Sequence, residues 1–125
     1  MHIINLTQHA ATPEQIAAGV FDLQGRGLEA LKELLTFETL PTTADVATRA
    51  EAIAVLSLAS EWETMHAMIG GAPFLMGPLA AALAARGTRA LFAFSKRESV
   101  ETVQSDGSVK KTAVFRHAGF VGGGL

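Results

Sequence analysis

Residues 66–73 read His-Ala-Met-Ile-Gly-Gly-Ala-Pro, and this stretch decides the fold that the sequence predicts. The apolar run before the two glycines predicts a short buried strand. Pro73 stands where proline commonly begins a helix, and Gly87 is a typical residue to end that helix. A strand, a glycine turn and a helix in this order are typical of an α/β domain.

The chain before this stretch predicts one strand and three helices. The strand is a short apolar run near the N-terminus, and the first helix has a capping-box pattern formed by Thr12 and Gln15. The second helix carries its leucines on one face, and prolines or threonines mark where the helices begin. In chain order these elements are a strand over 2–6, a helix from Pro13 to about Gly19, a helix over 26–37 and a helix from Thr42 or Thr43 to about Trp62.

The chain after this stretch predicts three more strands. Residues 89–95 are mostly apolar and predict the third strand of the sheet. Two β-prone runs, over 100–104 and 109–115, flank an Asp-Gly pair that is a typical two-residue hairpin turn. If Asp106 and Gly107 form that turn, the pairing register places Lys96 opposite His117 and Arg97 opposite Arg116.

Strands that alternate with helices predict parallel pairing and right-handed crossovers. We therefore expect a small Rossmann-like three-layer α/β domain with parallel strands and a C-terminal β-hairpin extension. The chain has 125 residues, which fits one domain, and we place that domain at residues 1–121. The glycine-rich residues 122–125 are expected to form a flexible tail.

Composition excludes several classes of protein. The chain contains no cysteine, which excludes disulfides, thiolate nucleophiles and cysteine-rich zinc sites. Its 10 basic and 12 acidic residues leave no strongly basic face, which argues against a partner of duplex nucleic acid. The N-terminus lacks the pattern of a signal peptide, so a cytoplasmic location is expected. Residues 67–85 carry no charge, but their glycines and prolines favour a strand and a helix over a membrane span.

Ligands of open parallel sheets bind beyond the carboxyl ends of the strands. If the predicted fold is right, three short segments meet at that edge. The residues that they supply are Thr7, Gln8 and His9 after the first strand, Gly70 and Gly71 after the second, and Ser95, Lys96 and Arg97 after the third.

Gly70 and Gly71 are the sharpest feature of this edge. Glycines let a backbone approach a ligand closely, and the N-terminus of the following helix favours an anion such as a phosphate. The turn matches neither the Walker loop nor the dinucleotide fingerprint, so no ATP or NAD cofactor is expected. The alternative interpretation is a tight turn with a purely conformational role.

The hairpin register adds a second candidate feature. Like charges that face each other destabilise a sheet unless something offsets them, and an anionic ligand held by Lys96, Arg97, Arg116 and His117 would do so. The alternative is that these side chains are ordinary solvated charges. His9 could act as a general acid or base or bind a phosphate or ribose hydroxyl, and the alternative there is a loop histidine bonded to the backbone.

The sequence lacks the residue patterns of several other classes of enzyme. No two histidines have the spacing of a metal site, and Glu98 is the only carboxylate near the proposed strand ends. No metal is therefore expected, and a glycosidase with two carboxylates is disfavoured. Ser95 lacks the Gly-x-Ser-x-Gly pattern of an α/β-hydrolase. Catalysis would have to use positioning, cations and a nucleophile that the substrate carries.

The segments Leu6-Thr7-Gln8-His9 and Thr12-Pro13-Glu14-Gln15 resemble the start of the smallest CRISPR-associated Rossmann-fold (CARF-like) proteins, which include the ring nucleases. The resemblance covers about the first fifteen residues. It implies a homodimer or higher homo-oligomer that binds a cyclic oligonucleotide. It also implies metal-free cleavage in which a ribose 2′-hydroxyl is the nucleophile, with His9 and Arg97 as the catalytic residues.

Two other functions stay open on the sequence. The same pocket would serve a protein that sequesters a small anionic nucleotide without cleaving it. A structural or adaptor domain without a small ligand would instead use its alanine-rich helices and the hairpin edge for oligomerisation.

Overall fold

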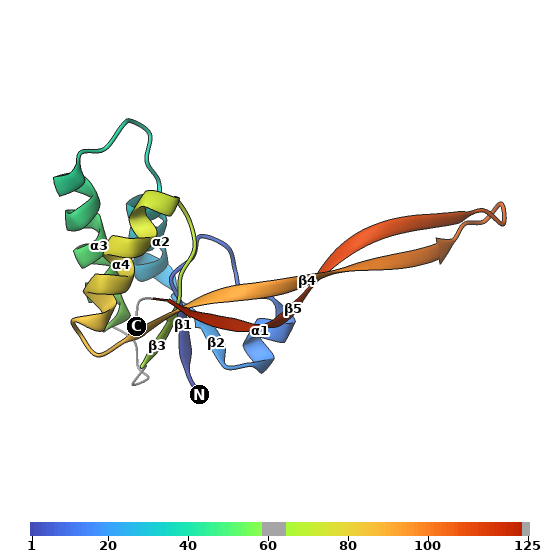
Figure 1. Ribbon diagram of the computed structural model, residues 1–125, viewed down its shortest axis with the longest axis horizontal. Coiled ribbons are helices and arrows are strands. Elements are labelled where there is room, and N and C mark those ends of the chain that lie inside the picture. Colours follow the sequence, from blue (N-terminus) through green and yellow to red (C-terminus); the bar gives the residue numbers. More distant parts are fainter. Residues whose placement is uncertain (59–64, 124–125) are drawn as a thin grey trace.

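The computed structural model describes residues 1–58 and 65–123 of the chain. Within these residues a mixed sheet is interleaved with helices, as Figure 1 shows. The elements are β1 (Ile3–Asn5), α1 (Pro13–Ala17), β2 (Val20–Asp22), α2 (Gly25–Leu35), α3 (Thr43–Ser57), β3 (His66–Met68), α4 (Pro73–Ala84), β4 (Arg89–Val103) and β5 (Val109–Gly123).

The five strands form one sheet in the order β2-β1-β3-β4-β5. β1, β2, β3 and β4 are parallel to their neighbours, and β5 returns antiparallel along β4. This arrangement confirms the predicted Rossmann-like α/β fold with a C-terminal β-hairpin. The parallel strands bring their carboxyl ends to one edge of the sheet, where a ligand site is expected.

Helices cover the two faces of the sheet unequally. α2, α3 and α4 pack on one face, and the main core lies between them and the strands. Ile4, Leu31, Ile53 and Leu79 are fully buried there. The other face carries α1 and a smaller buried cluster of Ile3, Val20, Met68 and Leu91. These buried apolar side chains account for most of the favourable free energy of folding.

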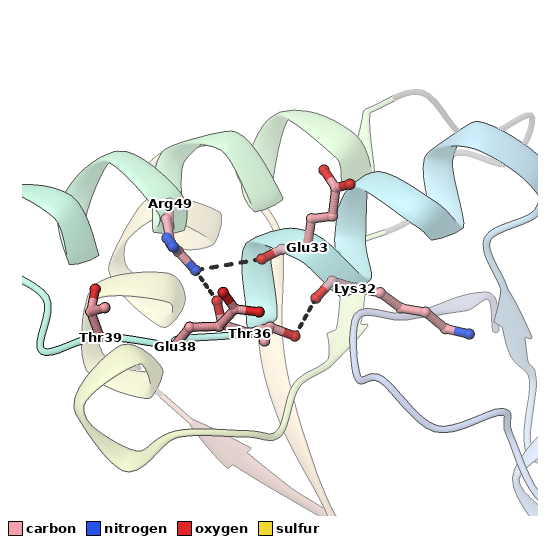
Figure 2. A pocket seen from close by; sticks show the side chains of 6 residues that line it. All are labelled: Lys32, Glu33, Thr36, Glu38, Thr39 and Arg49. Carbon is pink, nitrogen blue, oxygen red and sulfur yellow. Dashed lines mark hydrogen bonds between the residues drawn. The ribbon is translucent and has the colours of Figure 1, made fainter.

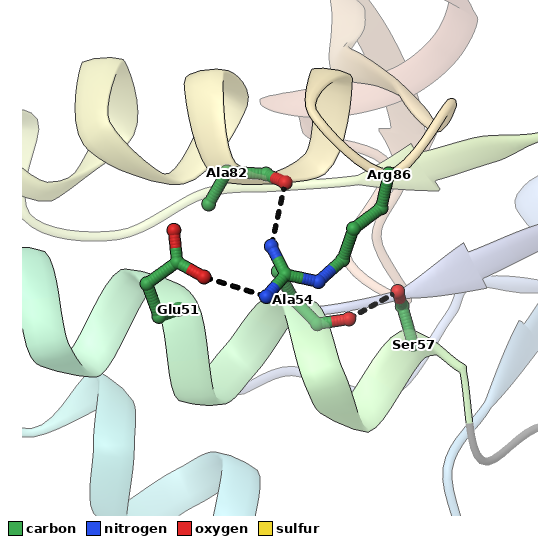
Figure 3. Close-up of polar contacts among 5 residues, drawn as sticks. All are labelled: Glu51, Ala54, Ser57, Ala82 and Arg86. Atoms are coloured by element: carbon green, nitrogen blue, oxygen red, sulfur yellow. Dashed lines mark hydrogen bonds and ion pairs between the residues drawn. The ribbon is translucent and has the colours of Figure 1, made fainter.

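α3 and α4 lie against each other, and a cation joins them (Figure 3). Arg86 donates to the Glu51 carboxylate at 2.6 Å and to the Ala82 carbonyl at 3.0 Å. Ser57 sits at the buried end of α3 and donates its hydroxyl to the Ala54 carbonyl at 2.6 Å. These bonds satisfy polar groups at the edge of an otherwise apolar helix contact.

The predicted starts of α1 and α3 are confirmed by capping boxes. Thr12 accepts from the Gln15 amide at 3.2 Å, and the Gln15 side chain accepts from the Thr12 amide at 3.0 Å. Thr42, rather than Thr43, caps α3 in the same way together with Asp45. The expected end of α3 at about Trp62 lies outside the described residues.

Three predictions about the strands need correction. Strand β2 was missed, because Val20–Asp22 has only three residues and directly follows Gly19. The third predicted strand and the first hairpin strand are one continuous strand, β4. Gly122 and Gly123, which we expected in a flexible tail, belong to β5 and pair with Leu91 and Ala90.

The hairpin register is also corrected. The turn contains three residues, since Val103 pairs with Val109 and the Gln104 amide bonds to the Ser108 carbonyl at 2.7 Å. Gly107 has φ +87° and its amide bonds to the Gln104 carbonyl, the pattern of a type I turn followed by a left-handed residue. Every predicted pair therefore shifts by one residue: Ser95 faces His117, Lys96 faces Arg116 and Arg97 faces Phe115.

No helix in the described parts of the chain is long and apolar enough to cross a membrane. The uncharged stretch over residues 67–85 divides into β3, the glycine turn and α4, as its glycines and prolines predict.

Candidate functional site

A pocket of about 410 Å³ opens at the carboxyl ends of β1 and β3, beside the first third of β4. Its volume falls in the usual range for small-molecule sites. The residues that line it are Thr7, Gln8, His9, Ala10, Thr12, Gln15, Met68, Ile69, Gly70, Gly71, Phe92 and Ala93. The structure thus brings together five of the predicted site residues, from the loop after β1 and from the glycine turn after β3.

Asn5 holds the loop that carries His9. It is the last residue of β1 and is buried. Its Oδ1 atom accepts from the backbone amide of Thr7 at 2.9 Å and from the Thr7 hydroxyl at 2.7 Å. Its Nδ2 atom donates to the carbonyl of His9 at 2.8 Å. One buried amide therefore fixes the backbone on both sides of Gln8.

Asp22 completes this network from the end of β2. Its Oδ1 atom accepts from Nδ2 of Asn5 at 2.7 Å. Both carboxylate oxygens also accept from the Ala11 amide, at 3.1 and 3.3 Å. The segment between β1 and α1 is tied to two neighbouring strands, which leaves the imidazole of His9 exposed beside the pocket.

The glycine turn forms the opposite wall of the pocket. Gly71 has φ +142°, a conformation that residues with a side chain rarely adopt. Ala72 is the N-cap of α4, and no side-chain hydrogen bond caps this end of the helix. The first turn of α4, which follows the pocket-lining glycines, therefore has the positive end of the helix dipole without a capping side-chain oxygen. Such an end favours an anion.

The floor of the pocket is apolar. Met68 ends β3 and Ile69 follows it, while Phe92 and Ala93 lie in the first third of β4. Its walls supply hydroxyl, amide and backbone groups, and His9 is the one titratable residue among the lining residues. An apolar floor under a few neutral hydrogen-bonding groups suits a ligand with a flat hydrophobic part and a polar part.

The other predicted site residues lie on the hairpin. Ser95, Lys96, Arg97, Arg116 and His117 are not among the residues that line the pocket. Arg116 instead forms an ion pair with Glu98 at 3.0 Å and a second with Glu14 at 3.6 Å.

His117 packs its ring against Phe120, with 4.7 Å between the centroids. Arg116 and His117 therefore make these contacts on the hairpin and to α1, and neither lines the pocket. The contacts also show what offsets the facing charges of Lys96 and Arg116: the Glu98 carboxylate.

Lys32 is a cation near the site that the sequence did not single out. It lies on α2 and lines a small cavity of about 70 Å³ together with Thr7, Gln8 and His9. Figure 2 shows its side chain extending away from Arg49. The loop after β1 therefore has the open pocket on one side and an ammonium group on the other.

A larger groove of about 530 Å³ lies between the end of α2 and α3 (Figure 2). Arg49 lines it, and its Nη1 atom donates to the carbonyls of Glu33, Leu34 and Thr36. Its guanidinium also lies 4.3 Å from the centre of the Phe37 ring. Because Arg49 donates to the last carbonyls of α2, we interpret it as a cap of the C-terminus of this helix. We do not interpret the groove as an anion site.

Sequence reasoning missed Asn5, Asp22 and Lys32. Asn5 carried a usable signal, because a buried strand that reads Ile-Ile-Asn-Leu places one amide among apolar residues. A buried amide needs hydrogen-bond partners, and the partners mark the loop it holds. Asp22 could not be identified without β2. In the described part of the chain, no cluster of three histidine or acidic residues could hold a metal ion.

Comparison with known proteins gives one family. A search of curated proteins and a search of solved structures each found no significant match. The model of the uncharacterized protein MJ1673 family matches residues 1–121, which include the pocket and the whole sheet except the last two residues of β5. The chain therefore belongs to the uncharacterized protein MJ1673 family.

Proposed function

We propose that this protein binds a phosphate-bearing nucleotide in the pocket between the loop after β1 and the glycine turn. The observation that carries the proposal is the convergence of Thr7, Gln8 and His9 with Gly70 and Gly71 around one cavity of about 410 Å³. The loop after β1 and the glycine turn are two separate segments that the sequence predicts at one edge of the sheet, and both line this pocket.

Each part of a nucleotide has a matching part of the pocket. The backbone of Gly70 and Gly71 suits a phosphate, because it lines the pocket directly before the uncapped, positive end of the α4 helix dipole. The apolar floor that includes Phe92 suits a base, since aromatic side chains stack on nucleobases. The hydroxyl of Thr7 and the imidazole of His9 suit ribose hydroxyls. Lys32 adds positive charge behind the loop.

The resemblance to CARF-like ring nucleases narrows the ligand to a cyclic oligonucleotide and adds a reaction. In that reaction the ribose 2′-oxygen attacks the neighbouring phosphorus, and the bond from phosphorus to the 5′-oxygen breaks. His9 would take the proton of the 2′-hydroxyl, and a solvent water would protonate the departing 5′-oxygen and regain its proton from the His9 imidazolium, which leaves a 2′,3′-cyclic phosphate and a 5′-hydroxyl. The amides of the glycine turn would stabilise the charge on the phosphate.

Binding without cleavage is the second candidate function, and one observation favours it. His9 is the only lining residue that can transfer a proton, so the pocket offers no separate acid and base. A protein that holds the nucleotide intact needs only the walls and the floor.

Calorimetry and chromatography test both functions. The purified protein is titrated with cyclic oligoadenylates, with AMP and with inorganic phosphate, and the ligand is recovered after denaturation in the presence of a chelator. Saturable binding of a nucleotide supports the proposal, and no heat or thermal stabilisation with any of these ligands contradicts it. Linear product indicates cleavage, whereas intact ligand indicates sequestration.

Two substitutions of His9 separate its roles. His9→Gln keeps a hydrogen-bonding side chain but cannot transfer a proton at neutral pH, and His9→Ala removes both properties. If His9 is catalytic, both variants lose turnover while His9→Gln still binds. If it only binds, His9→Gln retains the affinity and His9→Ala loses it.

A further inference from the structure

The hairpin extends far from the rest of the molecule (Figure 1). We call residues 94–119 the arm. β4 pairs with β3 only over Arg89–Leu91. Beyond Leu91, the described chain pairs β4 with β5 alone, so the hairpin there is a two-stranded ribbon. Every side chain of the arm is exposed or half-buried. A two-stranded ribbon is at best marginally stable in water, so a ribbon of this length is expected to pack on something.

One face of the arm is apolar enough to be buried. Phe115 is 71% exposed, Val103 is 73% exposed and Val109 is 55% exposed. The register places all three on the same face, because paired residues share a face and so do residues two apart along a strand. Lys111 and Glu101 also lie on this face, where they form an ion pair at 3.7 Å, and so does Arg97, which is paired with Phe115. The ion pair largely cancels its own charge.

The arm and the rest of the chain carry opposite net charges. The arm has five basic and three acidic residues, which leaves five basic and nine acidic residues elsewhere. The basic residues of the arm are Lys96, Arg97, Lys110, Lys111 and Arg116, and the acidic ones are Glu98, Glu101 and Asp106. The excess positive charge lies in the inner part of the arm, on Lys96, Arg97 and Arg116 against Glu98, and this part is electrostatically complementary to the acidic body of another copy of the same chain.

The charge distribution does not suit nucleic acid as the partner. The outer half of the arm, residues 99–113, carries Lys110 and Lys111 against Glu101 and Asp106. A ribbon that enters a groove of DNA needs an excess of positive charge along its length to contact phosphates. The balanced outer half and its exposed valines fit a protein surface better.

We propose that the arm packs against the body of a second copy of this chain, and that the second copy's arm packs on the first in return. This exchange buries the apolar face of both ribbons and brings each arm against an acidic body. It also closes the assembly as a two-fold dimer, since each copy supplies one arm and receives one. The inference does not depend on what the pocket binds.

Sedimentation velocity over a range of protein concentrations directly tests whether two copies of the chain exchange their arms. The unmodified chain is expected to be a dimer, and Phe115→Asp is expected to shift it to a monomer by placing a charge in the buried face. Leu40→Asp is the matched control, because Leu40 is 95% exposed and precedes α3, away from the arm. A monomeric unmodified chain, a dimeric Phe115→Asp or a monomeric Leu40→Asp would each overturn the proposal.

A second measurement uses the unmodified chain and so does not depend on how a variant folds. Copies labelled with ¹⁵N and unlabelled copies are mixed, and a carbodiimide joins lysines to nearby carboxylates. We expect mixed-isotope links from Lys96, Lys110 or Lys111 to carboxylates outside the arm. Links between copies that join only body to body, or only arm to arm, would overturn the proposed packing.

Discussion

The side chain of Asn5 donates a hydrogen bond of 2.7 Å to the carboxylate of Asp22, joining the ends of β1 and β2. The same asparagine accepts from Thr7 and donates to the carbonyl of His9. Two polar side chains at the ends of neighbouring parallel strands therefore set the shape of the loop that walls the pocket. The nucleotide-binding proposal depends on this loop being held in place before the ligand arrives.

Asp22→Ala should lower both stability and ligand affinity. It leaves Nδ2 of the buried Asn5 with one fewer acceptor and leaves the Ala11 amide without its carboxylate. Losing acceptors for partly buried donors costs about 1–3 kcal/mol of unfolding free energy. Urea denaturation measures that loss, and calorimetry measures the weaker nucleotide binding.

Asp22→Asn is the control, since its side-chain oxygen still accepts from Asn5. It should retain most of the stability and the affinity. If Asp22→Ala binds nucleotide as tightly as the unmodified chain, the Asn5–Asp22 pair does not organise the site.

Gly70→Ala and Gly71→Ala should act on different properties. A Cβ atom at Gly70 would lie 3.4 Å from Cγ2 of Thr7, in ordinary contact, and would narrow the pocket between its two walls. Gly71 has φ +142°, so alanine there strains the backbone although there is space for the added carbon. We expect Gly70→Ala to weaken nucleotide binding about tenfold with an unchanged melting temperature, a loss of about 1.4 kcal/mol of binding free energy.

Gly71→Ala should destabilise the fold by about 1 kcal/mol or more. Thermal melts and calorimetry on the two variants separate the effects. Unchanged binding by Gly70→Ala would place the ligand away from the glycine turn.

Thr42→Ala should destabilise the protein by about 1 kcal/mol, because it removes the side-chain cap of α3. Thr42 accepts from the Asp45 amide at 3.1 Å. Thr43→Ala, one residue further on and exposed, should change the unfolding free energy by less than about 0.5 kcal/mol. Equal effects of the two substitutions in urea denaturation would show that the cap contributes little.

Asp45 should make the stability depend on pH in the acidic range. The Asp45 carboxylate accepts a hydrogen bond from the Thr42 backbone amide, and together with the Thr42 side chain this lowers the pKa of Asp45. A carboxyl group with a lower pKa in the folded state contributes stability above its unfolded pKa. It loses that contribution as the pH falls through the folded pKa.

Melting temperatures measured from about pH 6 down to about pH 2 should therefore fall less steeply for Asp45→Asn than for the unmodified chain. Identical slopes for the two proteins would contradict the assigned effect of the Thr42 bonds.

Much of the parallel sheet could be predicted from local patterns. Helix caps such as Thr12 and Thr42 are formed with residues that are close in the sequence, and so is the glycine turn after β3. Such local features can be recognised from the sequence alone. β2 was missed because three residues are too few to show a period. The predicted hairpin register was wrong by one residue, because an Asp-Gly pair occurs in turns of two and of three residues.

Part of the pocket lining could be predicted from the sequence, because it depends on the direction of the strands. Strand ends in a parallel sheet share an edge, so Thr7, Gln8 and His9 could be placed beside Gly70 and Gly71 from strand order alone. The hairpin residues could not be placed, because the twist and length of a projecting ribbon decide where its charges go. Arg116 bonds to Glu14, a partner 102 positions earlier in the chain that no local pattern indicates.

A ¹⁵N–¹H NMR titration with a cyclic oligoadenylate tests the central claim most directly. The binding proposal predicts that the amides of Thr7, Gln8, His9, Gly70 and Gly71 shift first and furthest as ligand is added. The Asp22→Ala variant should show weaker shifts at the same residues. Shifts centred instead on Thr36, Thr39 and Arg49, or no shifts at saturating ligand, would contradict a nucleotide site at this pocket.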